Sequence, residues 1–332
     1  MSSSAAGSAV THRSGRTDDT AGLTSTVRIA QAKRAMLWGL AVLWLIDAGL
    51  QFQPTMFTFD FVSGVMQPSI ASDPSWLGAI STWTFGWVSP HIAQWNWVFA
   101  CTQLFIALGL FYGLIRRNNR AIVVGLVVSI FWGGSVWVFG EGTSGVFTGN
   151  GTLLTGGPGA VLLYVFIAAF YLLPDRWWQL SARFCFPRDA LALLFLYGGL
   201  AQVLTPGYWG ARGLPVLIEG QAAMAPPWMT ATLTPGVTVT QANPVLWNAV
   251  FAILLFAIAI LLFGPHPKTL GYWILGTTLV AIWYWGQALG GVFNSMGTDP
   301  NTPPLFVLLA IPGWLVWRAN RQETTDQSLG PP

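Results

Sequence analysis

The chain has 332 residues, of which 53% are hydrophobic, 14% are aromatic and only 8% are charged. Soluble domains carry about 25% charged residues, so the composition excludes an ordinary soluble domain and favours a membrane protein. The formal net charge is only +3, and the short basic clusters lie next to apolar segments, which argues against a nucleic-acid-binding protein.

The first 27 residues are rich in Ser, Thr, Ala and Gly and contain no apolar segment. A signal peptide needs an apolar core, and a chain with few large apolar residues cannot bury enough surface to fold. We therefore expect residues 1–27 to be a disordered tail. The first long apolar segment begins near Met36.

Eight apolar segments follow, and each predicts a helix that crosses the membrane. A membrane-spanning helix needs about 20 residues, so the short fourth, fifth and eighth segments must extend into their flanking residues. The predicted spans are 36–52, 95–115, 121–139, 158–173, 189–204, 244–263, 270–289 and 304–317. The sequence thus predicts an all-α membrane protein.

The basic residues predict how these helices are oriented. Cytoplasmic loops carry an excess of Lys and Arg. If both termini are cytoplasmic, 14 of the 15 Lys and Arg residues lie on the cytoplasmic side, and only Arg212 lies outside. We therefore expect a multi-pass protein of the plasma (inner) membrane with both termini in the cytoplasm.

Two outer loops are long, at residues 53–94 and 205–243. Both are rich in aromatic residues and Pro and contain few charges. Aromatic, amphipathic segments of this kind lie in the interface between membrane and water. We expect both loops to lie along the outer surface of the membrane.

The second half of the chain repeats features of the first. The segment WNWVFA at 95–100 returns as WNAVFA at 247–252, and Trp137 matches Trp283. The glycine-rich segment that starts at Gly140 matches the one that starts at Gly286, so that Glu141 falls on Gln287. Each half has an even number of spans, so the halves share one orientation. We expect two tandem four-helix bundles at 28–183 and 184–321, followed by a flexible tail at 322–332.

This layout resembles the DoxX-like membrane proteins, which include the DoxD small subunit of thiosulfate:quinone oxidoreductase. Members of that family are four-helix units with a long first outer loop, and the resemblance covers residues 28–321 as two tandem units. It rests on the layout and on the glycine-rich third loop, and it identifies no functional residue. The resemblance implies a subunit of a quinone-linked oxidoreductase that acts on sulfur compounds.

Several kinds of cofactor are excluded by the residues available. The His residues are His12 in the tail, His91 at the outer face and His266 at the inner face, so they cannot pair across one haem. The two Cys residues do not form an iron–sulfur motif, and a copper or zinc site is not expected. We therefore expect no intrinsic metal or cofactor. Redox chemistry would depend on a diffusible quinone or on the cofactor of a partner subunit.

The ionisable residues of the first half gather toward its outer end. Asp47 lies late in the first span, His91 precedes the second, and Glu141 follows the third. Ionisable groups at membrane depth are costly and usually face a bundle interior, and burial raises the pKa of a carboxyl group. Asp47, His91 and Glu141 are therefore the predicted catalytic, proton-handling residues. The residues expected to bind a quinone head group are Gln51, Trp87, Trp95, Asn96 and Trp137.

Other roles remain open for these residues. Glu141 could bind the backbone amides of its own loop, and Gln287 fits that role because an amide can accept the same hydrogen bonds. His91 follows Ser-Pro and precedes a helix, which favours a capping or interface role. The predicted function is a membrane subunit of a quinone-linked oxidoreductase, with a pocket open to the outer leaflet. The alternative is a non-enzymatic module, either a small-solute carrier or an assembly and anchoring subunit, so the sequence leaves open whether the protein is an enzyme.

Overall fold

The computed structural model describes residues 14–71, 73–178, 185–263 and 269–328, and the side chains of those that fall between 27 and 318. These segments fold into helices and connecting turns, without a strand in the described ranges. The prediction of an all-α chain is confirmed.

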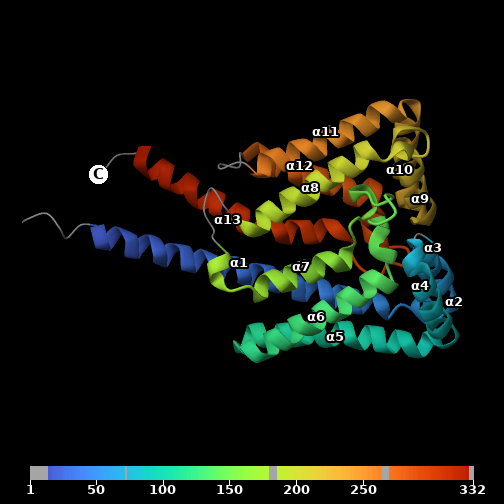
Figure 1. Ribbon diagram of the computed structural model, residues 1–332, viewed down its shortest axis with the longest axis horizontal. Coiled ribbons are helices and arrows are strands. Elements are labelled where there is room, and N and C mark those ends of the chain that lie inside the picture. The colour runs from blue at the N-terminus through green and yellow to red at the C-terminus, as the bar shows by residue number, and fades with distance from the viewer. Residues whose placement is uncertain (1–13, 72, 179–184, 264–268, 329–332) are drawn as a thin grey trace, which may run out of the picture.

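The long helices run side by side along the length of the molecule (Figure 1). In the first half they are α1 (Ser14–Gln51), α5 (Ile92–Arg116), α6 (Asn119–Phe139) and α7 (Ala160–Leu172). In the second half they are α8 (Phe186–Leu204), α11 (Pro244–Phe263), α12 (Thr269–Ala281) and α13 (Thr302–Ser328). A helix therefore occupies each of the positions where the sequence predicts a span.

Four helical stretches are long and apolar enough to cross a membrane. They are Val27–Gln51, Ser75–Arg116, Asn119–Phe139 and Pro244–Phe263, while Ala160–Leu172 and Thr302–Arg318 are shorter apolar helices. Large apolar side chains point outward on several of these helices, including Phe105, Phe131 and Ile260. Such a surface is stable in a lipid bilayer rather than in water, so the molecule is a helical membrane protein.

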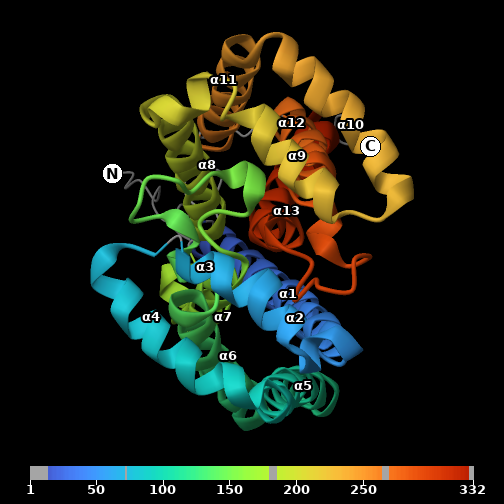
Figure 2. The same ribbon diagram turned by 90° about the vertical axis from the view of Figure 1, so that its right-hand side faces the viewer.

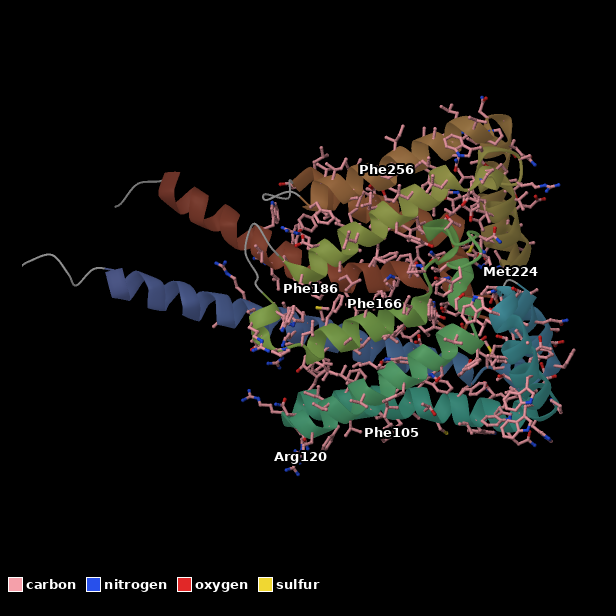
Figure 3. The ribbon with its side chains drawn as sticks, viewed as in Figure 1. Phe105, Arg120, Phe166, Phe186, Met224 and Phe256 are labelled. Carbon is pink, nitrogen blue, oxygen red and sulfur yellow. The ribbon has the colours of Figure 1, made fainter. Side chains whose placement is uncertain are left out.

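Short helices from both long loops lie across one end of this bundle (Figures 1 and 2). The first loop forms α2 (Phe59–Phe61), α3 (Gln67–Ala71) and α4 (Ser75–Val88), and the second forms α9 (Leu214–Met224) and α10 (Pro227–Ala242). Figure 3 shows Met224 at this end of the molecule and Arg120 at the opposite end. We call the end that carries α2–α4, α9 and α10 the capped end.

Three predicted boundaries need correction. Helix α1 begins at Ser14, inside the segment 1–27 expected to be a disordered tail, and α13 reaches Ser328, inside the expected tail 322–332. Once a helix exists, each added residue gains a hydrogen bond without a new nucleation cost, so both spans continue beyond their apolar parts. The span predicted at 270–289 ends earlier: a wider helical turn, Ile282–Gly286, follows α12.

The two halves share one apolar core. In the end-on view α1 and α13 lie together in the middle, with the rest of the first half on one side and the rest of the second half on the other (Figure 2). Leu40 and Trp44 of α1, Phe195 of α8 and Phe306 of α13 belong to one buried cluster. Because this core crosses the boundary between the halves, their relative position is fixed by packing.

Candidate functional site

Two loops at the capped end have the same unusual backbone. Residues 142–145 all have positive φ angles, and so do residues 288–291. Gly adopts this left-handed conformation without strain, whereas Thr143, Ser144, Ala288 and Leu289 adopt it at a cost of about 1 kcal/mol or more each. We call residues 140–159 the first glycine loop and residues 286–301 the second glycine loop.

A tryptophan fixes the end of each loop. The Trp137 indole donates a hydrogen bond to the carbonyl of Pro158 at 2.8 Å, and the Trp283 indole donates to the carbonyl of Pro300 at 2.8 Å. Each proline lies shortly before a helix, α7 in the first half and α13 in the second. Both loops therefore re-enter the bundle and lead into its last helix.

Glu141 lies against the amino end of α7. Its Oε2 accepts a hydrogen bond from the Ser144 hydroxyl at 3.1 Å, and its Oε1 accepts one from the Val161 amide at 3.4 Å. The first amides of a helix have no partner within the helix, and the helix dipole favours an acceptor there. A methyl group at Gly159 would overlap Glu141 Oε2, so the carboxylate fits tightly. These contacts match the loop-binding role that the sequence left open.

Gln287 occupies the corresponding place in the second half. Its Nε2 donates to the Thr302 hydroxyl at 3.0 Å, at the start of α13, and to the Leu153 carbonyl at 3.2 Å. Leu153 belongs to the first glycine loop, so Gln287 binds both its own helix and the other half of the chain. Its Oε1 is buried and has no hydrogen-bond partner in the described structure.

Each glycine loop contacts the opposite half. From the first loop, the Thr152 hydroxyl donates to Gln202 Oε1 at 3.0 Å, and the carbonyl of Gly149 accepts from Thr205 at 2.9 Å. From the second loop, the carbonyl of Ser295 accepts a hydrogen bond from Thr55. The capped end of the bundle is therefore assembled from both halves of the chain.

An acidic cluster forms where the loops meet α1. Asp47 on α1 is fully buried and faces the hydroxyl of Tyr164 on α7, which is fully buried too. Glu141 of the first loop and Asp299 of the second are close enough to interact electrostatically with both residues. We call Asp47, Glu141, Tyr164 and Asp299 the acidic cluster.

Asp299 and Tyr164 were not among the residues selected from the sequence. A signal for Asp299 was present, because the loop alignment that matches Thr152 to Thr298 places Asp299 opposite Leu153. Tyr164 gave no such signal, since a tyrosine in an apolar helix is common at bilayer interfaces. Only the folded chain brings Asp299 to α1.

The environment of the cluster favours protonated carboxyl groups. Burial, followed by the negative charge of Asp299, raises the pKa of Glu141 to about 8. Burial also raises the pKa of Asp299, although hydrogen bonds from Thr298 and Asn301 oppose that shift. The described part of the chain supplies no Lys or Arg among the groups that shift these two pKa values. Glu141 therefore holds a proton at neutral pH.

Several buried oxygen atoms near the cluster have no hydrogen-bond partner in the described structure. They include Oδ1 of Asp47, the hydroxyl of Tyr164, Oε1 of Gln51 and Oδ1 of Asn96. Gln51 lies one helical turn beyond Asp47, and the Asn96 amide donates to the Gln51 carbonyl at 2.8 Å. Buried polar atoms in native proteins are almost always hydrogen-bonded. These atoms therefore lack partners among the described side chains, and water or a polar ligand is the kind of group that could supply them.

The second half contains a matching pair of amide side chains, Gln202 and Asn248, whose oxygen atoms all have hydrogen-bond partners. The Asn248 side-chain amide donates to the backbone carbonyl of Gln202 at 3.3 Å, just as the Asn96 amide donates to the backbone carbonyl of Gln51. In addition, Gln202 Nε2 donates to Asn248 Oδ1 at 2.7 Å, and Gln202 Oε1 accepts from Thr152. The pair is satisfied in the second half and leaves two oxygen atoms unpaired in the first.

The remaining predicted site residues lie farther out. His91 is exposed at the residue that precedes α5, and among the described contacts no hydrogen bond or ion pair joins it to Asp47 or Glu141. Trp87 is exposed, stacks on Trp83 and contacts Trp95 at 5.4 Å between ring centroids. Trp137, by contrast, lies beside Gly159 next to Glu141. The structure thus groups Asp47, Glu141, Gln51, Asn96 and Trp137 near the interior. It leaves His91 exposed, and Trp87 and Trp95 belong to an aromatic cluster farther out.

Within the described ranges no group of three His, Cys, Asp or Glu residues is arranged to hold a metal ion. Comparison with models of protein families gave no match, and comparisons with curated proteins and with solved structures gave none either.

Proposed function

We propose that the protein is a membrane subunit of a quinone-linked oxidoreductase, in which the acidic cluster exchanges protons with a quinone head group. The observation that carries this proposal is the position of Glu141, a carboxyl group beside Trp137 whose pKa is raised by burial to about 8. Such a group can give up and regain a proton under working conditions. The nearby unpaired oxygen atoms of Gln51 and Asn96 offer hydrogen bonds to a head group.

The membrane arrangement belongs to this proposal. We infer eight spans in two tandem four-helix units of the DoxX-like kind, with both termini in the cytoplasm of a cell whose plasma (inner) membrane holds the protein. Three features recur at matching positions and support the duplication. They are the left-handed loop segment, the bond from Trp to a Pro carbonyl and the bond from Asn to a Gln carbonyl.

The proposed chemistry needs both electrons and protons. Reduction of a quinone to a quinol takes two electrons and two protons. Electrons come from a partner subunit that oxidises its own substrate, for which sulfur compounds are the class suggested by the resemblance. Protons reach the quinone oxygens from Glu141 and Asp47, and water reprotonates these carboxylates after each turnover.

Quinone binding tests the proposal directly. The purified protein in detergent would be titrated with a short-chain ubiquinone analogue and with a naphthoquinone analogue, and quenching of tryptophan fluorescence would be recorded. We expect saturable quenching, and we expect the apparent affinity for the quinone to be at least tenfold weaker in Gln51→Leu and Asn96→Leu. Trp273→Phe serves as a control, because Trp273 is exposed on the outer face of α12. Quenching that never saturates, or that is equal in all variants, would contradict the proposal.

A carrier is the second candidate, and one observation favours it. The acidic cluster contains Asp299 from the second half beside Asp47 and Glu141 from the first, which suits a solute path between two halves. Proteoliposomes with an internal pH-sensitive dye would separate the two functions. Proton movement coupled to an added solute, without quinone or electron donor, would favour the carrier.

A further inference from the structure

The two halves can be compared position by position around the acidic cluster. Gln51 and Gln202 correspond, because the carbonyl of each accepts a hydrogen bond from the matching asparagine of the next long helix. One turn earlier on the same helices lie Asp47 and Gly198. The first half therefore has a carboxyl group where the second half has no side chain.

In both halves, the residue that faces this position belongs to the glycine loop of the other half. Gly198 lies against Leu153, and a methyl group at Gly198 would overlap the Leu153 side chain. Leu153 follows Thr152 in the first glycine loop, just as Asp299 follows Thr298 in the second. The counterpart of the Gly198–Leu153 contact is thus the Asp47–Asp299 pair, and these two carboxyl groups do interact electrostatically.

The aromatic rings beside the Asp47–Asp299 pair and the Gly198–Leu153 pair also differ in polarity. Trp44 contacts Tyr164 at 4.4 Å between ring centroids, and at the matching place Phe195 contacts Phe306 at 5.6 Å. The phenylalanine pair has no polar atom, whereas the Trp44 indole donates to Ser129 at 3.0 Å. The second half is apolar at each of these matched positions, and the first half is polar.

The hydrogen-bond partners of the two carboxyl groups at the polar site differ. Asp47 Oδ1 and the Tyr164 hydroxyl are buried without a hydrogen-bond partner in the described structure, although the two side chains face each other. Asp299 differs, because its Oδ2 accepts from Thr298 at 2.9 Å and its Oδ1 accepts from the Asn301 amide at 2.7 Å. Hydrogen bonds of this kind favour the ionised form of Asp299, so a proton held by the pair rests on Asp47.

We propose that Asp47 and Asp299 form a proton-binding pair assembled from the two halves of the chain, which holds one exchangeable proton. Two carboxylates in a low-dielectric interior cannot both be ionised without a compensating cation, and the pair titrates as a unit. The titratable groups that face it are Glu141 and Tyr164. When the proton leaves, the O–H bond of Asp47 breaks and an O–H bond forms on the acceptor, which is water, or Glu141 once it has given up its own proton. This role requires no quinone and goes beyond the proposed function.

Infrared spectroscopy of the full-length protein in lipid nanodiscs tests the pair. A protonated carboxyl group has a carbonyl stretching band that shifts when H₂O is exchanged for D₂O. We expect such a band near neutral pH in addition to that of Glu141, which Glu141→Gln identifies. Asp47→Asn and Asp299→Asn should each remove the same additional band, and the double variant should remove no more. Asp60→Asn is the matched control, because Asp60 is exposed, and it should change nothing.

The outcomes separate this pair from its alternatives. A band that survives Asp299→Asn would overturn the proposal, and so would two bands lost independently in the two variants. If Asp47→Asn fails to fold, Asp299→Asn and Asp299→Leu decide the question, since Leu153 occupies the matching position in the other loop. The infrared experiment uses no quinone. If the separate quinone titration fails while the infrared band behaves as expected, only the proposed function is rejected.

Discussion

The two halves of this protein contain loops with the same left-handed backbone conformation, but they differ in how their buried polar groups are paired. In the second half, Gln202 and Asn248 satisfy each other, and Gly198 is covered by Leu153. In the first half, the matching Gln51 and Asn96 keep unpaired oxygen atoms, and Asp47 faces the second glycine loop.

This difference suggests a division of roles. A buried hydrogen bond contributes about 0.5–1.5 kcal/mol, and an unpaired buried polar atom costs about 1–3 kcal/mol. In the described structure the second half bears that cost at Gln287 and Tyr272, whereas the first bears it at several more positions. Natural proteins tend to accept such costs at functional sites, so the first half is where we locate the function.

The largest expected effect comes from disturbing a tight backbone contact between the halves. Gly286 lies against the carbonyl oxygen of Leu154, and a methyl group there would overlap that backbone atom. Because overpacking costs about 1–3 kcal/mol even where side chains can move, Gly286→Ala should lose about 3 kcal/mol of stability. Thermal unfolding in detergent measures this loss.

Gly276→Ala is the control for that experiment. Gly276 lies in α12 with no atom within 4 Å of the added methyl group, so its variant should be stabilised by about 0.5–1 kcal/mol. Equal melting temperatures for the Gly286 and Gly276 variants would show that the loop does not join the halves.

Glu141 allows its charge to be separated from its loop contacts. Glu141→Ala removes the acceptors of Ser144 and Val161 and should cost about 1–3 kcal/mol. Glu141→Gln should cost less than about 1 kcal/mol, because Gln287 holds the matching place. If the proton of Glu141 is functional, the Gln variant should still abolish growth complementation in the native host. Full complementation by Glu141→Gln would leave the residue with only its loop-binding role.

The amide pairs should respond differently to the same substitution. Gln202→Leu removes the acceptor of the Thr152 hydroxyl and the donor to Asn248 Oδ1, and it should lose about 1–3 kcal/mol. Gln51→Leu removes an oxygen atom that has no protein partner, so its cost should be at least 1 kcal/mol smaller. Denaturant unfolding of both variants gives the comparison. A larger loss for Gln51→Leu would show that its side chain is satisfied in the native protein.

The dependence of stability on pH tests the same difference between the halves without a substitution. The pKa of Glu141 rises from 4.5 to about 8 on folding, so between these values the folded state binds more protons than the unfolded state. Its stabilising contribution is fully present below pH 4.5, and it is lost as the pH rises through about 8. The slope cannot exceed about 1.4 kcal/mol per pH unit for one group.

Melting temperatures between pH 5 and pH 9 measure this dependence. The wild type should lose stability across that range, and Glu141→Gln should lose less. The second half offers no equivalent, because Gln287 does not titrate. A Gln variant with the wild-type pH profile would show that Glu141 is already ionised in the folded protein.

The sequence by itself determined the parts of the molecule that depend on local patterns. Apolar segments of sufficient length identify membrane helices because the bilayer has a fixed thickness, and every predicted span coincides with a helix. The loop alignment placed Glu141 opposite Gln287, and both side chains lie at the start of the last helix of their half. The ends of α1 and α13 were misjudged because composition alone does not show where an existing helix stops.

Only the tertiary structure decided which polar residues meet. Asp299 approaches Asp47 because the second glycine loop crosses to the other half, and no local pattern encodes a contact between segments so far apart in the chain. His91 was grouped with Asp47 because both lie near the capped end, but its side chain is exposed at the start of α5. The direction in which a side chain points depends on how its helix is rotated against its neighbours, and that rotation is set by packing of the whole core.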